Sequence, residues 1–215
     1  MQIKNKNLLF DLDGTLTDPK EGITKSFIYA LENLGVVAPT ADELEWCIGP
    51  PLHDSFFKML NDKEKTLKAV DLYRERYNKI GMYENIVYDN IHEVLSELKA
   101  RGHKLFLATS KLKSCADKII DHFEFRKHFS AVHGSEASGV RSDKAELIAY
   151  LLEQEALAPE NCIMIGDREY DVIGASKNNM MCIGVEWGYG SNQELTKAGA
   201  TYLVKSPGDL MKLKI

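Results

Sequence analysis

Two aspartates near the N-terminus, Asp11 and Asp13, have the residue type and spacing best suited to chemistry. They belong to the sequence DLDGTLTD (residues 11–18), which follows the apolar run LLF (residues 8–10). In an extended backbone, residues two apart point to the same side, so we expect the two carboxylates to share one face. Adjacent carboxylates repel each other unless a cation or a shared proton compensates. The segment therefore predicts a metal site, a proton-transfer site or both, the alternative being a simple Asp-Gly turn.

Two later segments add hydroxyl and cationic side chains where predicted strands end. Thr109, Ser110 and Lys111 follow an apolar strand expected at residues 104–108 and could hydrogen-bond phosphoryl oxygens. Lys144 stands at the start of a helix expected from Asp143, where backbone N–H groups and the helix dipole favour an anion. Taken singly, the Thr-Ser pair is more typical of a helix cap, and the lysine is more typical of a solvated side chain in the first helical turn.

A third segment supplies more carboxylates. Asp167 follows Gly166 at the end of the apolar strand expected at residues 162–165, and Asp171 comes four residues later. Carboxylate oxygens are the ligands that hard divalent cations prefer, so Asp167 is a candidate metal ligand. Asp171 could orient a metal-bound water, or it could only complement the dipole of the helix that begins there.

The elements that must position these groups follow from hydrophobic periodicity. From about residue 21 to 82 the pattern predicts consecutive helices, and the first of them ends at Gly35. Beyond residue 89, predicted helices alternate with short apolar strands at residues 104–108, 130–133, 162–165, 181–185 and 201–204. This alternation predicts an α/β fold with a doubly wound parallel sheet, which binds ligands at the carboxyl ends of its strands.

Composition narrows the classes of function. The chain has 215 residues, 44% hydrophobic and 27% charged, which predicts a globular protein with one core and a smaller accessory domain. A net charge of -5 argues against nucleic acid polymers and anionic membranes as partners, while small anionic substrates remain compatible. The scattered histidines do not form a zinc pattern, and four isolated cysteines are expected to be core thiols: Cys47, Cys115, Cys162 and Cys182. Without an apolar N-terminal stretch, a cytoplasmic location is expected.

Together, the segments resemble the four motifs of the haloacid dehalogenase superfamily of phosphohydrolases, over nearly the whole chain. The resemblance implies a Rossmann-like α/β core domain at residues 1–17 and 84–215 and an inserted helical cap at residues 18–83. Within the superfamily, the chain looks most like the phosphoglycolate phosphatase and 5'-nucleotidase-like branch. The supporting segments are IGPPL (48–52), RSDK (141–144), GDREYD (166–171) and GYG (188–190).

The resemblance also implies roles for individual residues. Asp11 would be the nucleophile that forms an aspartyl-phosphate, Asp13 the general acid and base, and Thr109 and Lys144 would neutralise phosphoryl charge. Mg²⁺ would be held by Asp11, the Asp13 carbonyl, Asp167 and Asp171. The family commonly has a Lys-Pro pair in its third motif, whereas Ala145 follows Lys144 here, so Arg141 competes for that role.

The expected reaction is hydrolysis of a small phosphorylated metabolite by a monomer or homodimer. A dehalogenase would not need the second carboxylate, which disfavours that activity. A phosphosugar mutase of the β-phosphoglucomutase type and a non-catalytic binding module remain alternatives. The glycines near residue 188 are interpreted as a flexible turn at the rim of the site. The expected substrate-binding residues are Gly14, Thr15, Gly49, Pro50, Pro51, His53, Ser110, Lys111 and Arg141.

Overall fold

The structure is a computed structural model that describes residues 6–213. The chain forms two compact units: one combines the segment up to Thr17 with the segment from Val87 onward, and the other comprises Asp18–Ile86. Among the described residues, no helix combines the length and the apolar character needed to cross a membrane. We expected no apolar stretch at the N-terminus. Residues 1–5 of that segment lie outside the described residues.

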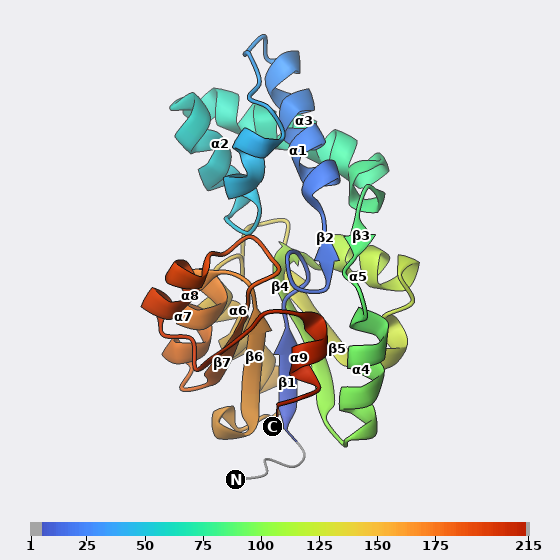
Figure 1. The fold of residues 1–215 in the computed structure, drawn as a ribbon. Helices are drawn as coiled ribbons and strands as arrows, with labels where there is room; N and C mark the ends of the chain where they lie inside the picture. The colour runs from blue at the N-terminus through green and yellow to red at the C-terminus, as the bar shows by residue number, and fades with distance from the viewer. Residues whose placement is uncertain (1–5, 214–215) are drawn as a thin grey trace. The chain divides into compact units, whose positions relative to one another are not determined.

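The larger unit is built on a six-stranded sheet in the order β5-β4-β1-β6-β7-β8 (Figure 1). Every neighbouring pair in this sheet is parallel, which confirms the predicted fold class. The strands are β1 (Asn7–Phe10), β4 (Lys104–Leu112), β5 (Phe129–Ser135), β6 (Cys162–Gly166), β7 (Met181–Val185) and β8 (Tyr202–Val204).

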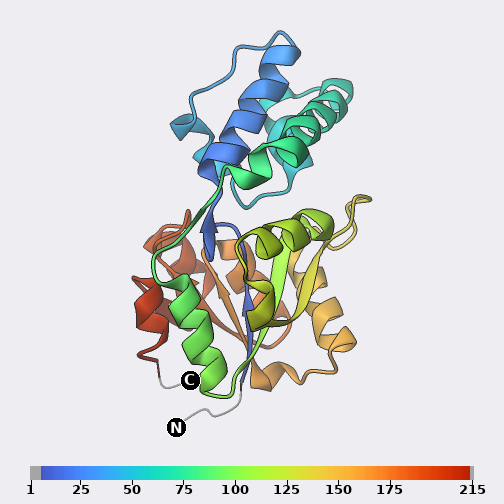
Figure 2. The same cartoon turned by 90° about the vertical axis from the view of Figure 1, so that its right-hand side faces the viewer.

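Helices cover both faces of the sheet because the chain winds outward from β1 in two directions. Figure 2 shows α4 (Ile91–Ala100) and α5 (Lys113–His122) on the same face. The other face packs against α6 (Lys144–Gln154), α7 (Glu169–Lys177) and α8 (Asn192–Ala198) through a buried apolar cluster. The direction of winding reverses between the neighbouring strands β1 and β6. In such sheets this reversal point is where a ligand-binding crevice forms.

Some short elements and the end of β4 were not expected from periodicity. α8, α9 (Pro207–Leu210) and the two-stranded sheet of β2 (Thr17–Asp18) with β3 (Ile86–Val87) are too short for a recognisable repeat. β4 continues to Leu112, four residues beyond its predicted end. All four cysteines are buried and free, as expected.

The smaller unit is helical, with α1 (Lys20–Asn33), α2 (Leu52–Leu60) and α3 (Lys63–Lys79) around an aromatic core. The Phe27 ring centroid lies 4.4 Å from that of Phe56 and 5.1 Å from that of Tyr73. Thr40 and Glu43 exchange hydrogen bonds at the start of a short 3₁₀ helix, Asp42–Cys47. These reciprocal hydrogen bonds have the pattern of a capping box.

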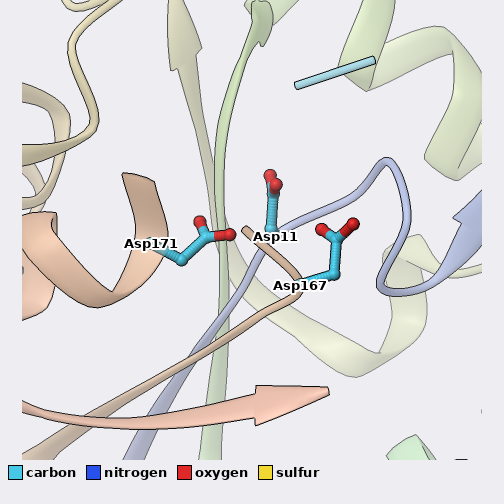
Figure 3. A group of neighbouring side chains, drawn as sticks. All are labelled: Asp11, Asp167 and Asp171. Carbon is cyan, nitrogen blue, oxygen red and sulfur yellow. The ribbon is translucent and has the colours of Figure 1, made fainter. Parts of the chain in front are cut away.

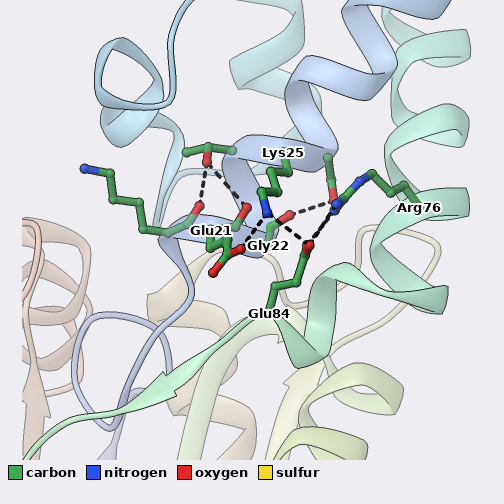
Figure 4. Close-up of polar contacts among 8 residues, drawn as sticks. Glu21, Gly22, Lys25, Arg76 and Glu84 are labelled. Carbon is green, nitrogen blue, oxygen red and sulfur yellow. Dashed lines mark hydrogen bonds and ion pairs between the residues drawn. The ribbon is translucent and has the colours of Figure 1, made fainter.

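A polar network attaches the end of the helical unit to its first helix (Figure 4). Arg76 of α3 donates two hydrogen bonds to the Glu84 carboxylate, at 2.7 and 3.0 Å, and a third to Ser26 of α1. The Gly22 N–H donates to the Glu84 carbonyl at 3.0 Å. A Cβ on Gly22 would lie 1.9 Å from the Gly81 carbonyl oxygen, so only glycine permits this approach. The segment that leaves the unit is thus held against α1 and α3.

Candidate active site

The strand register brings Asp11 beside the loop that follows β6. Phe10 pairs with Ile165, and the Asp11 N–H donates to the Ile165 carbonyl at 2.9 Å. β1 ends at Phe10, so Asp11 and Asp13 lie in the segment directly after the strand, where Asp13 forms a β-bridge with Thr17. Both stand at the carboxyl end of the sheet, because this segment leaves β1 at that edge.

Three buried carboxylates converge at this edge (Figure 3). Asp11, Asp167 and Asp171 each offer an oxygen atom, and these atoms all lie within 4.8 Å of one another. Asp167 and Asp171 are almost completely buried, and Asp11 is 8% exposed. The side chain of Asp13 is not part of this cluster, and its expected contribution to a metal site is its backbone carbonyl.

The electrostatics of the cluster favour a bound cation. Burial, followed by the nearby charges of Asp171 and Asp11, raises the pKa of Asp167 well above its ordinary value. Burial also raises the pKa of Asp171, against the opposing effect of Lys144. Within residues 6–213, no lysine or arginine forms an ion pair with Asp167, so its charge calls for another partner. A buried set of carboxylate oxygens fits the hard, oxygen-preferring Mg²⁺.

Lys144 is the cation that contacts two of these carboxylates, Asp11 and Asp171. Its Nζ lies 3.0 Å from Asp11 Oδ1 and 2.8 Å from Asp171 Oδ1, and it donates to the Ala108 carbonyl at 3.0 Å. The side chain is 4% exposed. The two carboxylates raise the pKa of Lys144 despite its burial, so the ammonium group stays charged.

The N-terminus of α6 differs from our expectation of an open anion site. The Asp143 carboxylate caps the helix by accepting the N–H groups of Ala145 at 2.8 Å and Glu146 at 3.1 Å. Two of the donors that we expected to meet an anion are therefore already used. The Lys144 ammonium group is the positive charge at this position.

Arg141 is directed into a different cluster. Its guanidinium carbon lies 4.1 Å from the centre of the Tyr150 ring, and it forms an ion pair with Glu136. The backbone of Arg141 has a φ of 61°, in the left-handed region that non-glycine residues seldom adopt. The side chains of Arg141 and Lys144 therefore contact different residues, although the two are only one helical turn apart in sequence.

Thr109, Ser110 and Lys111 all lie within β4. The sequence pattern predicted that this strand ends at residue 108, so we expected the three residues in the loop that follows. The Thr109 side chain is buried, and its Oγ1 accepts the Lys111 N–H at 3.2 Å. The Ser110 carbonyl accepts the Ser135 hydroxyl at 2.8 Å. Lys111 Nζ lies 2.8 Å from Asp13 Oδ2. Burial raises the pKa of Asp13, and the charge of Lys111 opposes this effect.

A loop after β7 contributes contacts that sequence reasoning missed. The Tyr189 N–H donates to Asp167 Oδ2 at 2.8 Å, and the Trp187 indole N–H donates to the Thr15 carbonyl. A Cβ on Gly188 would lie 2.3 Å from the Gly14 carbonyl oxygen and 2.4 Å from Asp167 Cβ. The glycines that we interpreted as a flexible rim therefore allow a close backbone approach to Asp167. The GYG pattern in the sequence indicates a tight backbone approach, but it does not show that Asp167 is the residue approached.

The remaining expected substrate residues divide between the two units. Gly14 has a φ of 77°, and a Cβ there would overlap Asp167, while the Thr15 hydroxyl donates to Asp167 Oδ1 at 3.4 Å. Gly49, Pro50 and Pro51 precede α2 in the helical unit. In that unit, His53 lines a hollow of about 340 Å³ with Phe57, Lys63 and Leu67.

Comparisons with known proteins agree with this geometry. A family model described as haloacid dehalogenase-like hydrolase matches residues 8–185. A 5'-nucleotidase from Pseudomonas aeruginosa is 50% identical over 194 residues, covering 90% of this chain and 88% of that protein. The tyrosine-protein kinase PtkA from Mycobacterium tuberculosis is 36% identical, covering 90% of this chain and 66% of that protein. The crystal structure of a "predicted phosphatase" from Clostridium acetobutylicum has a TM-score of 0.93 and 45% identity, covering 97% of this chain and 98% of that one.

Proposed function

The chain belongs to the haloacid dehalogenase-like hydrolase family, and we propose that this phosphatase hydrolyses small phosphate monoesters through a phosphoaspartate on Asp11. The observation that supports the proposal most is the direct contact of Lys144 with Asp11, at the edge where Asp167 and Asp171 also converge. A nucleophilic carboxylate beside a fixed cation suits attack on an anionic phosphoryl group, since the cation offsets the repulsion between them.

In the first half-reaction, an Asp11 oxygen forms a bond to phosphorus while the bond from phosphorus to the leaving oxygen breaks. Asp13 donates its proton to that oxygen, which departs as an alcohol. The Lys144 ammonium and the Thr109 hydroxyl stabilise charge on the phosphoryl oxygens. Because Thr109 Oγ1 accepts from Lys111, its own hydrogen is available for donation.

In the second half-reaction, Asp13, now ionised, takes a proton from water. The water oxygen forms a bond to phosphorus, the bond to Asp11 breaks, and inorganic phosphate leaves. One carboxyl group thus serves as acid and then as base. Its burial, which raises the pKa of Asp13, favours the protonated form needed for the first half-reaction.

Asp11, Asp167, Asp171 and the Asp13 carbonyl would hold Mg²⁺. The bound ion would supply positive charge that lowers the repulsion between Asp11 and the phosphoryl oxygens. Asp171 also accepts the Arg168 N–H at 3.2 Å and contacts Lys144, so it orients its neighbours as well. The Tyr189 N–H and the Thr15 hydroxyl fix the Asp167 carboxylate.

Substrate choice is proposed to depend on the helical unit, through Gly49, Pro50, Pro51 and His53. Phosphoglycolate and nucleoside monophosphates are the first substrates to test, following the family resemblance and the nucleotidase relative. The kinase relative raises a second outcome, in which a protein hydroxyl takes the phosphoryl group in place of water. A phosphosugar mutase would return the group to its sugar, and a binding module would release none.

Release of inorganic phosphate from a panel of phosphate monoesters, with Mg²⁺ and with EDTA, tests the proposal. We expect Mg²⁺-dependent turnover that Asp11→Asn reduces by at least about a hundredfold, since it removes the nucleophile. Asp71→Asn is the matched control, because Asp71 is an exposed residue of α3. Acid quenching during turnover should trap phosphate on Asp11, detected by mass spectrometry. Turnover that persists unchanged in Asp11→Asn would contradict the nucleophile assignment.

A further inference from the structure

A bulge at the end of β4 redirects the chain beside the proposed acid. Thr109 pairs with Gly134 of β5, and the next pair is Leu112 with Ser135, so Ser110 and Lys111 are extra residues in β4. Bulges bend a strand and change the direction of its side chains, and they are frequent beside active sites. A Cβ on Gly134 would lie 2.8 Å from the Lys111 carbonyl oxygen, so a glycine on β5 makes room for the bulge.

The bulge places the Lys111 ammonium group on Asp13. The Nζ lies 2.8 Å from Asp13 Oδ2, and the two side chains are only 9% and 13% exposed. An exposed lysine pair has little effect on structure, because water screens it and the side chain stays mobile. A pair this well buried holds both side chains in one arrangement, since separating them would leave an unpaired charge out of water.

The second oxygen of Asp13 has a different environment. Asp13 Oδ1 is buried and accepts no hydrogen bond from the described residues. A buried polar atom without a partner is uncommon in a folded protein and often marks a functional position. Lys111 thus occupies one carboxylate oxygen and leaves the other for a group that the substrate brings.

We propose that Lys111 is a positioning residue that holds Asp13 by Oδ2 so that Oδ1 transfers the proton to the leaving oxygen. This inference rests on the proposed function, in which Asp13 is the acid. It replaces our expectation that Lys111 binds substrate, because its ammonium group is already engaged with Asp13. The negative charge that forms on Asp13 as the proton departs is compensated at 2.8 Å.

Leaving-group dependence tests this role, because an acid matters more when the leaving oxygen is more basic. Phenyl phosphate and p-nitrophenyl phosphate have similar shapes, and phenolate is the more basic leaving group. We expect Lys111→Met to lower kcat/KM for phenyl phosphate at least about tenfold more than for p-nitrophenyl phosphate, as Asp13→Asn should also do. Lys113→Met, at an exposed lysine two residues later, is the matched control and should lower neither.

Three outcomes would overturn the inference. Equal losses on both esters in Lys111→Met would indicate a general structural role. A higher KM with unchanged kcat would indicate substrate binding. If Asp13→Asn itself affects both esters equally, the acid role of Asp13 fails and the inference fails with it, whereas Asp11→Asn still tests the nucleophile separately.

A double variant separates action through Asp13 from any other effect. In the Asp13→Asn background, Lys111→Met should change kcat/KM for either ester less than about twofold, because its partner is already disabled. If the loss of kcat/KM caused by Lys111→Met multiplies the loss caused by Asp13→Asn, the inference is contradicted. If Lys111→Met alone does not fold, as judged by circular dichroism, the comparison of Asp13→Asn with the double variant still decides it, since the double variant leaves no unpaired charge.

Discussion

Lys144 Nζ lies 3.0 Å from Oδ1 of Asp11, so the cation of the third motif touches the first aspartate of the chain. The contact joins residues 133 positions apart in sequence through the register of the parallel sheet, and Asp171 shares the same ammonium group at 2.8 Å. Arg141, the competing cation, lies against Tyr150 and Glu136. The geometry therefore supports our proposal that Lys144, and not Arg141, neutralises phosphoryl charge.

Replacing each cation separately tests this preference. We expect Lys144→Met to lower kcat about 10²–10³-fold, the usual cost of removing a fixed charge or donor from a reacting group. Arg141→Met is the matched control and should lower kcat less than about threefold, because it changes a neighbouring cluster only. Steady-state kinetics on p-nitrophenyl phosphate measures both. A larger loss in Arg141→Met than in Lys144→Met would reverse the assignment.

The sequence predicted the α/β fold and the strands that surround the site, because hydrophobic alternation and strand-end loops are local patterns. It could not separate Lys144 from Arg141. Both are cations near the start of one helix, and the choice depends on a φ of 61° at Arg141 and on a contact with Tyr150. Neither feature can be recognised in the local sequence pattern.

The tertiary contacts of Gly188 could not be predicted from the sequence either. The pattern around residue 188 gave no indication that its backbone touches Gly14, more than 170 residues earlier. The bulge in β4 was also missed, because its two extra residues follow an apolar run that already forms a complete strand. These features depend on which strands become neighbours, and that follows only from the complete fold.

The close approach of Gly188 to Asp167 predicts a strong effect of one methyl group. Gly188→Ala would force the loop or Asp167 to move, so we expect a loss of about 1–3 kcal/mol in the free energy of unfolding. Mg²⁺ should also bind more weakly, because Asp167 is a proposed ligand. Gly208→Ala is the matched control, since a Cβ there meets nothing nearer than 4.0 Å. Urea unfolding and calorimetric Mg²⁺ titration provide the measurements, and equal effects of the two variants would refute the prediction.

The Arg76–Glu84 pair in the helical unit predicts an energetic coupling. The side chains are 16% and 20% exposed and share two hydrogen bonds. We expect a double-mutant cycle with Arg76→Met and Glu84→Gln to give a coupling of about 1–2 kcal/mol in the free energy of unfolding. The Lys79–Glu75 pair of α3 is 69% and 50% exposed and should give about 0.3–0.5 kcal/mol. Similar couplings for the two pairs would show that the network of Figure 4 contributes no more than an exposed pair.

Proton release should accompany metal binding at the aspartate cluster. Burial raises the pKa of Asp167 well above its ordinary value of 3.8 in the folded protein without metal. Between those two pKa values the folded state binds more protons than the unfolded state, so the free energy of unfolding of the metal-free protein falls as pH rises. Mg²⁺ binds the ionised carboxylates, and its stabilising effect must therefore grow over the same interval.

Thermal unfolding with Mg²⁺ and with EDTA at about pH 5 and about pH 8 checks this prediction. The increase in Tm caused by Mg²⁺ should be larger at the higher pH. In Asp167→Asn, which has no carboxyl group to ionise at that position, both the increase and its dependence on pH should be smaller. An increase that is the same at both pH values in the wild-type protein would contradict proton displacement from the cluster by Mg²⁺, and an equal increase in wild type and Asp167→Asn would contradict Asp167 as a metal ligand.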